Sequence, residues 1–168
     1  MHELNIKLTR AGLHDLALVS SLASQIWKEH YTPIIGKAQV DYMLKEMYSA
    51  EGLNDQVKNK NHIFYLIQTG VQTVGFISVS AEKENKWFLN KFYILDDMAG
   101  KGLGTKAFEE LKKIIAPKKM TLTVNRQNYK SINFYFKNHF KIDHVADFDI
   151  GHGYVMNDFV MVWEKVAG

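Results

Sequence analysis

The sequence predicts a mixed α/β fold, and three observations lead to this prediction. Short segments with alternating apolar and polar residues, typical of strands, are interspersed with segments whose apolar residues recur at helical spacing. The predicted order is strand, helices, three strands, helix, strand, helix and two strands, which differs from the regular alternation of a βαβ sheet. No repeat, low-complexity tract or linker interrupts the 168 residues, so we expect a single domain over residues 1–168.

The first half of the chain is predicted to contain one strand, three helices and a hairpin. Ile6 and Leu8 alternate with polar neighbours and indicate the first strand. Apolar spacing predicts a helix over about 13–30 that Pro33 prevents from continuing, a second helix around 40–47 and a short one around 53–57. The apolar runs 63–67 and 74–79 flank a turn signal at Thr69-Gly70, and they predict a hairpin. The polar residues 81–85 are interpreted as a turn before a strand at about 87–95.

The second half begins with a glycine-rich loop at 96–104. A helix is expected from Leu103 until Pro117 stops it, and alternation predicts a strand at about 120–125. Residues 129–139 have helical spacing, and the segments 141–150 and 153–163 are predicted as two further strands.

Composition limits the classes of function. No apolar run approaches the ~18 residues that a membrane span needs, and the N-terminus lacks the apolar core of a signal peptide. With no cysteine there is no disulfide framework, thiolate zinc site or cysteine nucleophile. The net charge of +3 is spread along the chain, which favours solvated faces over a nucleic-acid surface. We therefore expect a cytoplasmic protein that binds neither nucleic acid nor membrane.

The glycines at 100, 102 and 104 lie between a predicted strand and a predicted helix. Glycine permits positive φ, and a helix N-terminus carries unpaired N–H groups and a partial positive charge, so this arrangement suits a pyrophosphate. The spacing matches neither a P-loop nor a dinucleotide-binding fingerprint. On the loop alone, a plain connecting turn is the alternative.

From about Phe92 to Phe140 the chain resembles the GNAT superfamily of N-acetyltransferases. Its acetyl-CoA loop reads Gln/Arg-x-x-Gly-x-Gly/Ala after a strand, and Gly102 and Gly104 match the two later positions. Ala99 replaces the leading Gln/Arg, which removes one side-chain contact to CoA and leaves the backbone amides in place.

A second family segment follows at the right separation. Asn128, Ser131, Tyr135 and Phe140 fall in register, while His139 replaces the usual glycine. The segments 27–31 and 150–158 further resemble a small-molecule branch that includes polyamine acetyltransferases. The resemblance covers nearly the whole chain and implies a mostly antiparallel sheet of about six to seven strands flanked by helices.

The resemblance also implies how acetyl-CoA is held as cosubstrate. Backbone groups of Phe92, Tyr93 and Ile94 would bond the pantetheine and the thioester oxygen, and Asn128 would fix the pantetheine arm. Lys137 would reach a phosphate, although a solvated lysine is its plain alternative. The amides of the loop would hold the pyrophosphate, and these residues are Gly100, Lys101, Gly102, Leu103, Gly104 and Thr105.

Tyr135 is the candidate general acid that the resemblance indicates. The CoA sulfur leaves as a thiolate and needs a proton, which a phenol with a pKa near 10 can supply at close range. By helical periodicity alone, Tyr135 would be a core aromatic residue.

The general base is left open by the sequence. Many relatives carry a carboxylate on the strand before the glycine loop, but residues 87–95 contain none. The alternatives elsewhere, acting directly or through water, are Glu29, His30, Tyr31, Asp149 and His152. The histidines lack metal-ligand spacing, so no metal is expected.

Two classes of function compete at this point. The first is an acyltransferase that moves acetyl from acetyl-CoA to a primary amine of a small molecule, polyamine-like or amino-acid-like, in a direct ternary complex. The second is a catalytically silent acyl-CoA-binding sensor or scaffold. The sequence does not identify the acceptor, and it leaves a homodimer open.

Overall fold

The computed structural model describes residues 5–70, 72–98 and 100–166. Within these described residues, seven strands form one hydrogen-bonded sheet in the order β1-β2-β3-β4-β5-β7-β6. The registered pairs are antiparallel for β1–β2, β2–β3, β5–β7 and β6–β7, and parallel for β4–β5. The predicted mixed α/β class with a mostly antiparallel sheet is therefore confirmed.

The chain divides into two compact units. The first comprises Met1–Ser80 and Asn90–Ala116, and the second comprises Ala81–Leu89 and Pro117–Gly168. The boundaries fall inside β3 (Gln72–Lys83) and β4 (Lys86–Ile94), so both strands contribute to both units. That the whole chain behaves as one domain stays a prediction.

The first unit contains an antiparallel meander of β1 (Ile6–Arg10), β2 (Ile63–Thr69) and the start of β3. Leu8 pairs with Ile67, and Leu66 with Phe76, which places apolar side chains in register along the meander. The predicted hairpin at 63–79 is confirmed.

Helices account for much of the rest of the first unit. The short 3-10 helix η1 (Leu13–Asp15) leads into α1 (Leu16–His30), followed by α2 (Thr32–Ile35), α3 (Lys37–Tyr48) and α4 (Ala50–Lys58). Helix α1 contacts α2, α3 and α4. Pro33 lies in the first turn of α2, where its missing N–H costs no hydrogen bond. Ser49 caps α4 by accepting a hydrogen bond from the Gly52 N–H at 3.1 Å.

Two elements after β4 complete the first unit. They are the 3-10 helix η2 (Asp96–Met98) and α5 (Leu103–Ile115), which contacts β1. Leu103, Ala107, Phe108 and Leu111 form the buried face of α5, as helical spacing predicts.

One predicted boundary is wrong. Residues 81–83, interpreted as a turn, continue β3 as an exposed extension, and the connection to β4 is confined to Glu84 and Asn85. Asn85 adopts a left-handed conformation with φ 60°, and its carbonyl accepts from the Lys118 N–H at 2.7 Å. The polar sequence did not indicate a strand because these side chains remain in solvent while the backbone alone stays extended.

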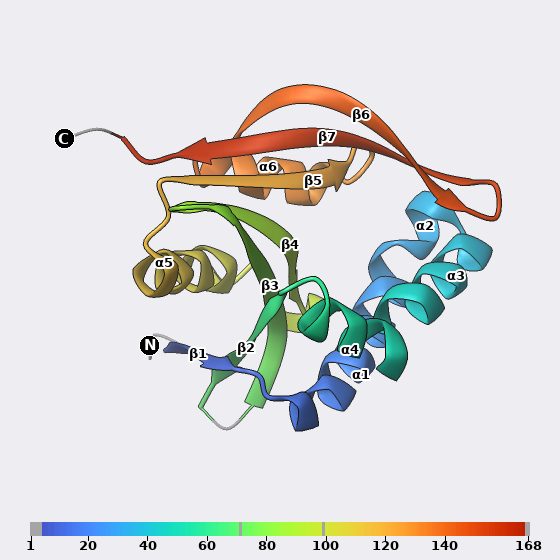
Figure 1. Cartoon of the computed structure of the whole chain (residues 1–168), viewed down its shortest axis with the longest axis horizontal. Coiled ribbons are helices and arrows are strands. Elements are labelled where there is room, and N and C mark those ends of the chain that lie inside the picture. Colours follow the sequence, from blue (N-terminus) through green and yellow to red (C-terminus); the bar gives the residue numbers. More distant parts are fainter. Residues whose placement is uncertain (1–4, 71, 99, 167–168) are drawn as a thin grey trace. The chain divides into compact units, whose positions relative to one another are not determined.

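The second unit is built on β5 (Lys119–Asn125), α6 (Tyr129–Lys137), β6 (Lys141–Gly151) and β7 (Tyr154–Glu164). The first residues of β4 pair in parallel with the first residues of β5. β6 and β7 form a long hairpin (orange and red in Figure 1) whose turn residues His152 and Gly153 both have positive φ, 53° and 79°. Its core includes Met120, Leu122 and Met161.

Candidate active site

The glycine loop opens α5 in a form that suits an anion. Gly100 and Gly102 have φ of 77° and 73°, and a Cβ added at either would meet nothing within 4 Å. Gly102 is the N-cap of α5, and no side chain caps this helix end. A cradle of left-handed glycines with open space, at the start of a 13-residue helix, suits an anionic group such as a pyrophosphate.

The neighbouring loop residues differ in their exposure. Lys101 and Thr105 are exposed, Gly104 is half-buried, and Leu103 is anchored in the core. Asp96 and Asp97 are exposed on η2, in agreement with carboxylates that lie away from a phosphate. Ala99, the departure from the family loop, lies outside the described residues.

The expected pantetheine segment is the end of β4. Phe92, Tyr93 and Ile94 are half-buried there. A Cβ added at Gly75 on β3 would collide with the Tyr93 carbonyl oxygen and would lie 3.0 Å from Ile94 Cα. Gly75 therefore allows β3 to approach β4 closely where the thioester contact is expected.

Five aromatic side chains of the first unit form what we call the aromatic cluster. The Tyr93 ring lies 5.9 Å from Trp27, 6.2 Å from Tyr31 and 5.6 Å from Phe76, and Tyr48 lies 5.8 Å from Trp27. The Trp27 indole nitrogen and the Tyr48 hydroxyl are both buried inside this cluster. Burial raises the pKa of Tyr48 well above its ordinary value.

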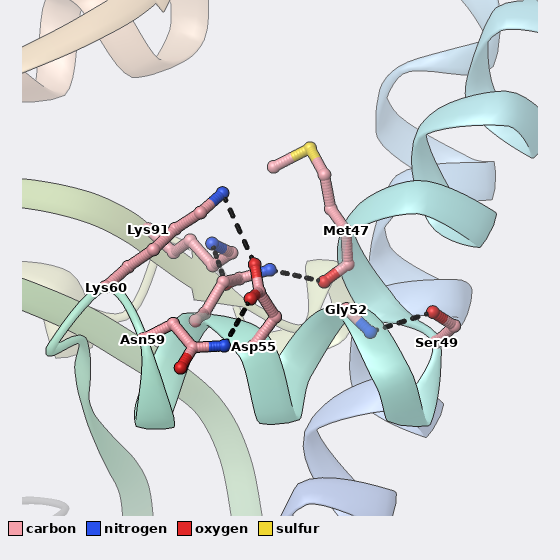
Figure 2. Close-up of polar contacts among 8 residues, drawn as sticks. Met47, Ser49, Gly52, Asp55, Asn59, Lys60 and Lys91 are labelled. Atoms are coloured by element: carbon pink, nitrogen blue, oxygen red, sulfur yellow. Dashed lines mark hydrogen bonds and ion pairs between the residues drawn. The ribbon is translucent and has the colours of Figure 1, made fainter.

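Lys91 on β4 is buried beside this cluster, and no sequence pattern indicates a role for it. Its Nζ donates to Gln56 Oε1 at 2.7 Å and lies 5.5 Å from the centre of the Tyr48 ring. Gln56 in turn donates to the Met47 carbonyl at 2.7 Å. Figure 2 also draws Asp55 and Lys60 of the same unit, which form an ion pair with each other at 3.7 Å.

The surroundings of Lys91 destabilise its charged form. Burial, and then the positive charge of Lys60, lowers the pKa of Lys91 to about 7. The nearby His62 is affected in the same way: burial, followed by the charges of Lys91 and Lys60, lowers its pKa to about 4. An alternating strand pattern with a lysine in the middle gives no sign of this burial, because lysine in a strand usually reaches solvent.

The second unit carries the other predicted site residues on and before α6. Asn128 is buried, and its Oδ1 caps α6 by accepting from the Ser131 N–H at 3.3 Å. Tyr135 is buried, with its ring 5.4 Å from Phe134 and 5.4 Å from Phe140. Lys137 is exposed in the last turn of α6. Asn128 and Tyr135 thus lie on one helix within this unit, and their roles toward CoA stay predictions.

Asp158 on β7 is a buried carboxylate that the sequence analysis did not single out. It is 4% exposed and is paired in register with Asn125 of β5. Its Oδ1 has no hydrogen-bond partner among the described residues. Burial raises its pKa to about 6, although the Thr123 hydroxyl and the Arg126 charge oppose this rise.

The base candidates from the sequence lie in different surroundings. Glu29 is exposed at the end of α1, and Tyr31 is buried in the aromatic cluster. Asp149 is exposed and accepts from the Gly151 N–H at 2.9 Å, and His152 is exposed in the β6–β7 turn. None of these contacts identifies a base.

Among residues 5–70, 72–98 and 100–166, no three His, Cys, Asp or Glu side chains gather in a way that could hold a metal ion. Within the same ranges, no helix has both the length and the apolar character needed to cross a membrane.

Comparison with known proteins identifies the family. The model of the acetyltransferase (GNAT) family matches residues 23–140, well over half of the chain. This chain belongs to the GNAT acetyltransferase family. It is therefore an acetyl-CoA-dependent N-acetyltransferase, as the glycine loop and the α6 segment predicted.

Individual relatives agree with this GNAT assignment. The spermidine N(1)-acetyltransferase of Thermoplasma acidophilum is 29% identical over 147 residues, which span 83% of this chain and 91% of that protein. The PaiA N-acetyltransferase from Thermoplasma acidophilum, solved in complex with coenzyme A, has a TM-score of 0.79 at 26% identity and covers 96% of this chain and 100% of its own. A GCN5-related N-acetyltransferase from Rhodopseudomonas palustris has the same TM-score at 14% identity, over 98% of this chain and 99% of its own, which supports the fold alone.

Proposed function

We propose that this GNAT enzyme transfers the acetyl group of acetyl-CoA to a primary amine of a small molecule, polyamine-like or amino-acid-like. The observation that carries the proposal is the cradle at the start of α5, where Gly100 and Gly102 are left-handed, open and without a side-chain cap. The similarity to a protein named spermidine N(1)-acetyltransferase supports a polyamine as the first acceptor to test.

The amine attacks the thioester directly in a ternary complex. A covalent acetyl-cysteine intermediate is excluded because the chain contains no cysteine. In this proposal the backbone of Phe92 to Ile94 binds the pantetheine and donates a hydrogen bond to the thioester oxygen. One such preorganised donor to a developing oxyanion lowers the barrier by about 3 kcal/mol.

Tyr135 is the proposed general acid for the departing thiolate. In this proposal the Tyr135 phenol on α6 donates its proton to the sulfur as the C–S bond breaks. Asn128, the N-cap residue about two turns earlier, is proposed to hold the pantetheine arm, and Lys137 to reach a phosphate.

The proposal also covers the cell compartment of the enzyme and its oligomeric state. In this proposal the enzyme consumes acetyl-CoA in the cytoplasm. A homodimer is the alternative to a monomer, and light scattering at micromolar concentration decides between them.

A thiol-release assay with acetyl-CoA, DTNB and a panel of amines tests the function. The chain contributes no thiol background. Spermidine, spermine, putrescine, amino acids, an aminoglycoside and a peptide N-terminus are compared, and we expect release that depends on a small primary amine. Gly102→Val, which forces a β-branched residue into the left-handed region, is expected to lose CoA binding and release together.

The other outcomes separate the competing functions. CoA binding without release on any amine would support a silent acyl-CoA sensor instead. Release with the peptide alone would contradict a small-molecule acceptor.

A further inference from the structure

The second unit holds a buried carboxylate, Asp158, one oxygen of which lacks a hydrogen-bond partner among the described residues. Asp158 on β7 is 4% exposed, and its Oδ1 reaches no donor among the described residues. A buried carboxylate oxygen without a hydrogen-bond donor costs folding free energy, so such a group is rarely retained for packing alone.

The charged groups around Asp158 do not neutralise it. Arg126, which follows β5, is engaged by Asp147 of β6, since its Nη2 lies 2.7 Å from Asp147 Oδ1. The Thr123 hydroxyl of β5 supplies a hydrogen bond, and Asp147 adds a second negative charge. The Asp158 carboxylate therefore keeps one oxygen available for a proton.

Asp158 lies at the end of β5 from which α6 begins. It is paired in register with Asn125, and the Asn125 carbonyl accepts from the Asn128 N–H at 3.0 Å. Asn128 starts the helix that carries Tyr135. The carboxylate is thus next to the start of the segment that the proposed function assigns to the pantetheine arm and the general acid.

We propose that Asp158 is the general base, whose Oδ1 accepts, directly or through one water, the proton that the acceptor ammonium must lose before attack. This inference rests on the proposed function and supplies its missing base. Strand β4 offers no carboxylate, and the two carboxylates among the alternatives, Glu29 and Asp149, are exposed.

The protons and electrons of the reaction balance. The acceptor R–NH₃⁺ gives one proton to Asp158, and its nitrogen lone pair then forms the C–N bond at the thioester carbonyl. As the tetrahedral intermediate collapses, the C–S bond breaks and the sulfur keeps the electron pair. The thiolate takes the Tyr135 proton, the nitrogen's second proton restores Tyr135, and Asp158 releases its proton to solvent, which leaves amide, CoA thiol and H⁺.

The test compares wild type, Asp158→Asn and a control, Asp143→Asn. Asp143 is an exposed carboxylate of β6 whose Oδ2 lies 2.6 Å from His144 Nδ1. At pH 7.5 we expect Asp158→Asn to lower kcat/KM by about 10²- to 10⁴-fold, with unchanged CoA affinity, while the control keeps wild-type activity. The ratio of wild-type to mutant kcat/KM should shrink as the pH falls through about 6, because wild-type Asp158 becomes protonated there.

A second acceptor separates a base from a structural or binding role. A fluorinated amine that is already neutral at pH 7 needs no base, so Asp158→Asn should lose far less activity with it. The melting temperature of Asp158→Asn should equal or exceed that of wild type, because the buried charge is removed.

Each remaining outcome overturns the inference. Equal losses with both amines, or a lowered melting temperature with lost CoA binding, would assign Asp158 a structural role. Unchanged activity on an amine that the wild type acetylates would exclude it from the reaction. Failure of the wild type on every amine would instead contradict the proposed function, so the two failures are distinguishable.

Discussion

Lys91 and Asp158 are two single residues that carry charge where water is largely excluded. Burial shifts both pKa values toward the neutral form, to about 7 for Lys91 and about 6 for Asp158. Their effects on stability have opposite signs. Above pH 7 the folded chain gives up the Lys91 proton that the unfolded chain keeps, so stability rises with pH. Between about pH 4 and 6 the folded chain keeps the Asp158 proton that the unfolded chain has lost, so this contribution to stability falls as the pH rises.

Replacement of Lys91 by Met is expected to flatten the alkaline rise in stability. In wild type the Lys91 contribution grows between about pH 7 and pH 10, by up to about 1.4 kcal/mol per pH unit. Urea unfolding at pH 6.5, 7.5, 8.5 and 9.5 measures this slope for both proteins. His62 does not interfere, because its shift to about 4 acts below this window.

The control for this measurement is Lys58→Met, an exposed lysine at the end of α4. It should keep the wild-type slope. A Lys91→Met slope equal to that of wild type would show that Lys91 holds its charge in the folded chain.

Tyr135→Phe tests the proposed acid at the level of a single atom. The phenyl ring keeps the contacts with Phe134 and Phe140, so folding and CoA affinity should persist. Without a proton donor for the thiolate, kcat should fall by about 10²-fold or more. Steady-state thiol release and calorimetric CoA titration measure the two effects separately, and an unchanged kcat would remove Tyr135 from the mechanism.

At the scale of elements, the end of β4 depends on one glycine of its neighbour. Gly75 lets β3 lie against the Tyr93–Ile94 backbone, and the Leu95 N–H donates to the Val74 carbonyl at 2.8 Å just beyond. The segment expected to bind the pantetheine is thus fixed by backbone contact.

Gly75→Ala is expected to displace this part of β4, because the added methyl meets backbone atoms that cannot rotate away. We expect a loss of about 1–3 kcal/mol in the free energy of unfolding, together with a weaker affinity for CoA. Urea unfolding measures the loss in the free energy of unfolding, and calorimetry measures the affinity for CoA. Gly70→Ala is the control: its φ of 58° strains the turn, but the space around it is open, so CoA affinity should stay unchanged.

At the scale of the whole molecule, CoA binding is linked to folding. A ligand that binds only the folded chain stabilises it by about 2.7 kcal/mol at a hundredfold excess over Kd. For a chain of this length we expect the melting temperature to rise by about 5–10 °C. Gly102→Val should show no rise, and the absence of a rise in wild type would contradict CoA binding at the α5 cradle.

Much of the fold could be predicted from the sequence because most of its helices and strands have a recognisable local pattern of apolar and polar residues. The alternation in β5, the helical spacing in α1 and α5, and the Thr69-Gly70 turn all led to elements that the structure contains. Residues 81–83 could not be predicted, since an exposed strand end needs no apolar residue. The turn at Glu84 and Asn85 is set by Asn85 instead.

Some residues of the candidate site could likewise be predicted from the sequence, and others could not. The glycine loop could be found because positive φ at Gly100 and Gly102 requires a particular residue type at a particular position. Lys91 and Asp158 could not, because a lysine and an aspartate within strands are ordinarily exposed, and only the packing of distant segments buries them.

The sequence by itself thus determined the order of the elements, the glycine cradle at the start of α5 and membership in an acetyl-transferring family. These features depend on spacing and backbone conformation, which neighbouring residues set. Tertiary structure alone decided that Lys91 lies against Gln56 and Tyr48, that Gly75 lies against Tyr93, and that Asp158 is buried beside Asn125. The physical reason is that burial and charge environment depend on residues far apart in the chain, and no local pattern records which of them meet.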